Sequence, residues 1–94
     1  MNDNISLYIN ELKNKILPKY KIIGISTQCI LAVSLFRSNS ELPPFVANIF
    51  GLEFRPYVYR SRTLVVAKIS RYISNCNVQE LDQVKKKLYA DLTE

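Results

Sequence analysis

The chain has 94 residues, of which 48% are hydrophobic, and carries 13 Lys and Arg against 8 Asp and Glu for a net charge of +5. This length allows one domain with a sizeable core, and the composition excludes a generally disordered protein. The positive charge favours an anionic partner.

The sequence contains no histidine and only two glycines, Gly24 and Gly51. Histidine is the commonest general base and metal ligand, and phosphate-binding loops need several glycines. We therefore expect no enzyme activity, no catalytic residues, no cofactor and no metal site.

The two cysteines, Cys29 and Cys76, stand far apart and form no CxxC pattern. They are expected to be free thiols in a reduced compartment. The N-terminus lacks the basic and then apolar pattern of a signal peptide, and no apolar run approaches the ~20 residues of a membrane span. These features predict a cytoplasmic protein that does not contact a membrane.

The first predicted helix covers residues 5–17, within an N-terminal amphipathic segment 1–20. Asp3 or Asn4 is its expected N-cap and Pro18 its end. Its apolar stripe either packs in the core or forms the seam of a homodimer: Ile5, Tyr8, Ile9, Leu12 and Ile16. Residues 19–24 are expected to connect it to a second, central helix at 27–38, which is apolar nearly all round.

A polar loop at residues 38–40 precedes a short helix at 43–51, where Pro43 and Pro44 suit the first turn and Gly51 the end. The spacing of Ala47, Gly51 and Val58 is typical of a helix-turn-helix. A small residue there lets the helices approach, a glycine takes the turn, and an apolar residue anchors the second helix. The predicted helix-turn-helix core spans residues 27–75.

The longest helix is predicted at residues 56–74, followed by a C-terminal amphipathic helix at 78–92 within segment 77–94. Asn77 and Glu80 have capping-box spacing. The last helix is expected to bury Val78, Leu81, Val84, Leu88 and Leu92. Residues 85–87, all lysine, are interpreted as a solvent-facing run, with a second phosphate-binding patch as the alternative. Together the elements predict one all-α domain over residues 1–94, a compact bundle of about five helices.

The order of these elements resembles the C-terminal DNA-binding domain of the bacterial replication initiator DnaA, over residues 29–92. Residues 30–37 match its apolar helix, residues 44–51 (PFVANIFG) match its helix closing on Phe-Gly, and Gly51 to Val58 repeats its Gly-to-Val distance. Lys68 and Ile69 resemble its Lys-Ile pair, one helical turn later. The resemblance implies a Trp-repressor-like helix-turn-helix. The family's base-contacting Arg-Asp-His-Thr-Thr is replaced here by residues 53–57, EFRPY.

Basic residues alternate with tyrosines along the predicted second helix of the motif. Arginine can pair with phosphate or guanine, and tyrosine hydroxyls contact the DNA backbone. The candidate DNA-binding residues are Arg55, Tyr57, Tyr59, Arg60, Arg62, Lys68 and Arg71. Arg62 falls nearer the apolar side of the helix and is expected either to pair with an acid such as Glu53 or to lie outside the core.

These residues predict a small basic protein that binds double-stranded DNA mainly through phosphates, with modest specificity, in regulation or replication. The alternative is a protein–protein interaction module on the same scaffold. In that case Phe54, Tyr57 and Tyr59 would anchor a protein partner.

Overall fold

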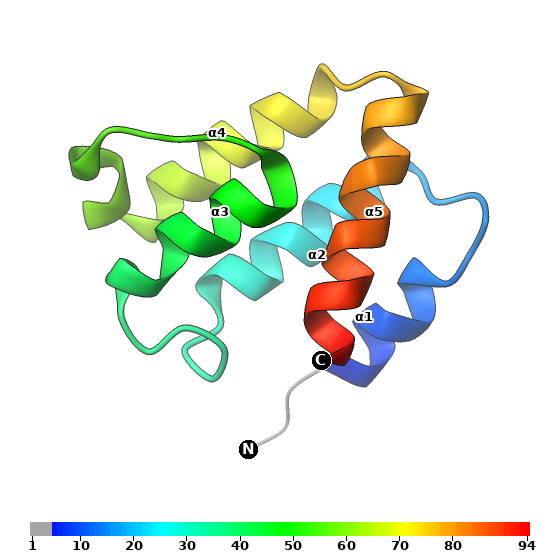
Figure 1. Cartoon of the computed structure of the whole chain (residues 1–94), viewed down its shortest axis with the longest axis horizontal. Coiled ribbons are helices and arrows are strands. Elements are labelled where there is room, and N and C mark those ends of the chain that lie inside the picture. Colours follow the sequence, from blue (N-terminus) through cyan, green and yellow to red (C-terminus); the bar gives the residue numbers. More distant parts are fainter. Residues whose placement is uncertain (1–4) are drawn as a thin grey trace.

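Residues 5–94 are described by a computed structural model and form five α-helices and two short 3₁₀ helices (Figure 1). In chain order these are α1 (Ile5–Leu12), α2 (Lys19–Leu31), η1 (Asn39–Glu41), α3 (Leu42–Phe50), η2 (Pro56–Arg60), α4 (Arg62–Ser74) and α5 (Val78–Thr93). The predicted all-α fold class is confirmed. The proposed caps Asp3 and Asn4 lie outside the described residues.

The first helix differs from the prediction at its C-terminal end, and the second differs at both ends. α1 ends at Leu12 instead of residue 17, and α2 begins at Lys19, where a connector was expected. Pro18, with φ −63° and ψ 153°, is the N-cap of α2 and does not end α1. Because proline lacks an N–H and has a fixed φ, it suits the entry of a helix as well as the segment after one.

The predicted central helix at residues 27–38 is displaced, since α2 ends at Leu31. Residues 32–38 turn instead, and Leu35 and Phe36 pack against the core from this turn. A continuous apolar run has no period, so its sequence does not distinguish a buried helix from a buried turn.

α2 lies at the centre of the fold, and α4 packs along it (Figure 1). α5 packs against α1 and α3. The fully buried aliphatic side chains come from α2, α3, η2, α4 and α5, and form one core. They are Ile22, Ile30, Leu42, Val46, Ile49, Val58, Val65, Ile69, Ile73, Val84 and Leu88.

Two apolar residues predicted to be buried are on the surface. Ile16 of the first stripe is 88% exposed because α1 has already ended, and Val78 is 81% exposed at the start of α5. Of the other stripe residues, Leu12 is buried in the core and Tyr8 packs against the core cluster, whereas Ile5 and Ile9 are half-buried. The homodimer seam stays a prediction.

The short helix α3 follows the prediction closely. Prolines occupy its first turn, and Gly51 at its C-cap has φ 66°, a left-handed conformation that favours glycine. Ala47, however, is exposed, so it does not mediate the close approach of two helices. That part of the helix-turn-helix interpretation is wrong.

The predicted helix at residues 56–74 is divided into η2 and α4. Ser61 separates them in an extended conformation (φ −135°, ψ 116°), and its hydroxyl caps α4 by accepting a 3.3 Å hydrogen bond from the Leu64 N–H. Residues 51–61 therefore connect α3 to α4, where a helix-turn-helix has a turn of about three or four residues. The connection is a long loop containing a 3₁₀ helix.

The capping box predicted before the last helix is confirmed. The Asn77 Oδ1 atom accepts from the Glu80 N–H at 2.8 Å, and the Asn77 N–H donates to the Glu80 carboxylate at 2.9 Å. The radius of gyration of 12.5 Å is close to the value of about 12 Å expected for a compact domain of this length.

Candidate nucleic-acid interface

The 3₁₀ helix η2 projects three of the predicted residues into solvent. Val58 is its anchor, 1% exposed in the core, as the sequence predicted for this apolar residue. Arg55 at the N-cap, Tyr57 and Arg60 are exposed around it, and Tyr57 is 54% exposed. Burial of a single residue thus orients the charged and aromatic neighbours outward.

Tyr59 is held against the protein. Its ring packs on that of Phe54, with centroids 6.0 Å apart, and both residues pack against the core. Its backbone carbonyl accepts a 2.8 Å hydrogen bond from the Asn39 side-chain amide. Burial raises the pKa of the Tyr59 phenol. Tyr59 positions η2 and offers less surface than Tyr57.

Lys68 of α4 contacts the loop that precedes η2. Its ammonium lies 5.9 Å from the centroid of the Phe54 ring, within the range of a cation–π contact. The Lys68 side chain itself is exposed. Arg71 is also exposed, about 4.5 Å further along the helix axis. The structure therefore brings Lys68 to Phe54, which precedes η2 and packs on Tyr59, and Arg71 extends the basic residues along α4.

Arg62 has a different role from the one predicted. Its guanidinium donates hydrogen bonds to the carbonyl oxygens of Ile30, at 3.0 Å, and Phe36, and its Nε donates to Asn39 Oδ1 at 2.7 Å. The Ile30 carbonyl is in the last turn of α2, where carbonyls lack helical partners and a positive charge is favourable. Arg62 is thus a half-buried clamp on α2, is not paired with Glu53, and is not free to contact DNA.

Asn39 is the residue of this region that the sequence did not point to. It joins η1 to η2 and α4 through the bonds to Tyr59 and Arg62. A polar residue in a predicted loop carries no sequence signal for such a role, because its partners lie twenty or more positions away.

The basic surface formed by Arg55, Arg60, Lys68 and Arg71 makes no ion pair with an acidic residue in residues 5–94. No Asp or Glu occurs between Glu53 and Glu80. The two ion pairs found in residues 5–94, Lys21–Glu11 and Lys86–Asp82, lie elsewhere. These four cations are exposed and have no carboxylate partner in the described chain, so their charge is available to an anionic ligand.

No family model, curated protein or solved structure matches this chain. The resemblance to the DnaA domain therefore stays a prediction. One of its matches is not met, because residues 30–37 contain only the end of α2. Another is met, because α3 does close on Phe50 and Gly51.

Residues 5–94 contain neither a cluster of metal-ligating side chains nor a helix suited to cross a membrane. Nowhere in residues 5–94 do three His, Cys, Asp or Glu side chains lie where they could share a metal ion. None of the described helices is long and apolar enough to cross a membrane. Both cysteines are free and buried.

Proposed function

We propose that the chain binds double-stranded DNA through the basic surface, which comprises Arg55, Arg60, Lys68 and Arg71. The observation that carries this proposal is the presence of four exposed cations without acidic partners on adjoining elements, η2 and α4. Arginine forks and a lysine ammonium in this state can neutralise phosphates and release counterions.

Contacts of this kind fix the protein on the duplex without reading its sequence. Tyr57, exposed between the two arginines of η2, adds a hydroxyl that can donate to a phosphate and a ring that can pack on a sugar. The proposed binding is phosphate-dominated with modest specificity, in keeping with the absence of the DnaA family's base-contacting residues. A role in DNA regulation or replication belongs to the same proposal.

A charge reversal in the basic surface tests the proposal. Arg60→Glu should weaken binding to a labelled random duplex at ~50 mM salt by about tenfold or more, since it replaces an attraction with a repulsion. Lys87→Glu on α5 is the matched control, because it changes the net charge equally and lies outside this surface. Equal losses in the two variants would contradict the site, since net charge or the lysine run at residues 85–87 would then contribute to the affinity as much as this surface does.

The alternative function, protein binding through three aromatic anchors, has less support. Phe54 and Tyr59 pack on each other and on the core, which leaves Tyr57 as the one of the three that is mainly exposed. A partner anchored on Tyr57 would stay bound at high salt and be lost in Tyr57→Ala, whereas DNA would be released by salt.

A further inference from the structure

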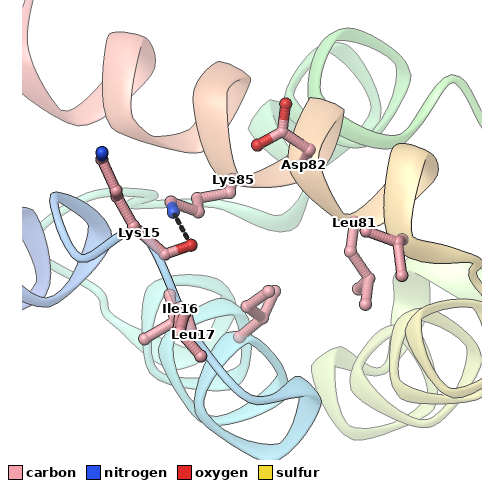
Figure 2. A pocket seen from close by; sticks show the side chains of 8 residues that line it. Lys15, Ile16, Leu17, Leu81, Asp82 and Lys85 are labelled. Atoms are coloured by element: carbon pink, nitrogen blue, oxygen red, sulfur yellow. Dashed lines mark hydrogen bonds between the residues drawn. The ribbon is translucent and has the colours of Figure 1, made fainter.

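An apolar groove lies at the other end of the molecule from η2, between the α1–α2 connection and the first two turns of α5 (Figure 1). Its volume is about 270 Å³, and its apolar lining comprises Ile16, Leu17, Ile22, Val78 and Leu81. We call this the α5 groove. Figure 2 shows Lys15, Ile16 and Leu17 facing Leu81, Asp82 and Lys85 across it.

The rim of the α5 groove exposes apolar surface. Ile16 is 88% and Val78 is 81% exposed, the two highest values among the large apolar side chains of residues 5–94, whereas Ile22 is 1% exposed. A ligand that covered Ile16 and Val78 would remove aliphatic surface from water on both sides of the groove. The groove is thus suited to receive an apolar side chain.

The shape of the groove is fixed by Lys85. Its ammonium donates to the carbonyl oxygens of Asn14 and, at 3.2 Å, Lys15, so the α1–α2 connection is tied to α5 (Figure 2). A ligand therefore meets walls that are already positioned, which reduces the entropy cost of binding.

The charge left at the rim is positive. Asp82, the acidic residue of the lining, is paired with Lys86 at 3.0 Å. Lys15 and Lys85 have no carboxylate partner among the described residues, and Lys13 lies beside Lys85 in the adjoining hollow. The groove is therefore complementary to a ligand that combines an apolar group with negative charge.

We propose that the α5 groove docks a short acidic segment of a partner protein, whose leucine or similar aliphatic side chain enters between Ile16 and Val78 while its carboxylates meet Lys15 and Lys85. A DNA strand has no aliphatic side chain to fill the groove. Because η2 lies at the opposite end (Figure 1), this docking does not depend on DNA contacts made by η2 and leaves that part of the basic surface free.

The test is a ¹⁵N–¹H NMR titration of the whole chain with the synthetic peptide acetyl-DEELLEED-amide. We expect shift changes concentrated in residues 15–17 and 78–85, with a Kd of about 1 mM or below. A peptide with serines in place of the leucines should bind at least about fivefold more weakly, as expected for the loss of buried aliphatic groups.

Two variants locate the site. Ile16→Ser and Lys15→Glu, both at exposed positions, should each weaken the peptide at least about fivefold with an unchanged Tm. Val33→Ser, at another exposed aliphatic residue (66% exposed), is the matched control and should bind like the wild type.

Several results would overturn the proposal. They are no shift changes up to about 5 mM peptide, equal binding of the serine peptide, or changes centred on residues 55–71. A random DNA duplex is titrated in parallel, and shifts of residues 15–17 and 78–85 by DNA in place of the peptide would assign the groove to nucleic acid. If the chain bound the peptide but not the DNA duplex, only the function proposed for the basic surface would be overturned.

Discussion

The Nε atom of Arg62 donates a 2.7 Å hydrogen bond to Oδ1 of Asn39, which joins the start of α4 to η1. The amide nitrogen of the same Asn39 donates to the Tyr59 carbonyl at 2.8 Å. Through these two bonds one half-buried arginine and one amide hold η2, which carries the proposed DNA contacts, on the scaffold of α2 and α4. The stability of the fold and the position of the site therefore depend on the same clamp.

Arg62→Ala should lower the free energy of unfolding by about 2–4 kcal/mol, because it leaves the Ile30 and Phe36 carbonyls and Asn39 without their charged donor. Arg62→Lys should recover only part of this loss, since an ammonium cannot reproduce the planar fork. Urea unfolding measures both. Arg37→Ala, at an exposed arginine, is the control, with an expected change within about 0.5 kcal/mol. An Arg62→Ala protein as stable as this control would contradict the clamp.

The two glycines should respond to alanine in opposite directions. At Gly51, φ of 66° is unfavourable for alanine by about 1–2 kcal/mol, although an added Cβ would meet no atom within 4 Å. At Gly24, within α2, an added Cβ is equally unobstructed, and helix propensity favours alanine by about 0.5–1 kcal/mol. Thermal unfolding should therefore show a lower Tm for Gly51→Ala and a higher Tm for Gly24→Ala. Two shifts of the same sign would be inconsistent with the conformation of Gly51.

Alkaline pH should destabilise the protein through Cys29. Burial, and secondarily the charge of Asp91, raises the pKa of this thiol from its usual 9.0 to about 12. Since the thiol ionises more readily in the unfolded chain, its contribution to stability is complete below pH 9 and is lost as pH rises towards 12, by up to about 1.4 kcal/mol per pH unit.

Unfolding free energies measured from pH 8 to 11 test this pH dependence in Cys29→Ala, which removes the thiol. The variant should lose stability less steeply than the wild type, even though its smaller side chain lowers the stability at pH 8. Burial also raises the pKa of Cys76, which remains in both proteins, so the difference between the slopes is the readout. If the unfolding free energies of the variant and the wild type changed in parallel with pH, the pKa of Cys29 would be the same in the folded and unfolded states.

Short sequence patterns predicted the helix ends that are marked by a characteristic capping residue. Gly51 at the end of α3 and the Asn77–Glu80 box before α5 were predicted from short-range chemistry, and the structure confirms both. Pro18 was ambiguous, because proline suits the approach to a helix as well as the segment after one. The apolar spacing of residues 56–74 fits one continuous helix and does not indicate the break at Ser61. A serine hydroxyl is also common in loops, so the serine itself does not predict a helix N-cap.

The candidate site could be predicted from the sequence only in part. Alternating basic and aromatic residues identify a surface such as that of Arg55, Tyr57 and Arg60, because exposure of long charged side chains is the default. Arg62 could not be assigned from the sequence, since its role depends on carbonyls of α2 and the following turn, which tertiary packing brings to it. The exposure of Ile16 and Val78 likewise depends on where α1 ends and α5 begins.

The most direct test of DNA binding is the salt dependence of affinity for a labelled random duplex, measured by fluorescence anisotropy at ~50 and ~200 mM salt. About four phosphate contacts, from Arg55, Arg60, Lys68 and Arg71, predict a plot of log affinity against log salt with a slope of roughly −3 to −4. Arg60→Ala should reduce the slope by about one. The absence of binding at ~50 mM salt, or an affinity independent of salt, would contradict DNA binding through this surface.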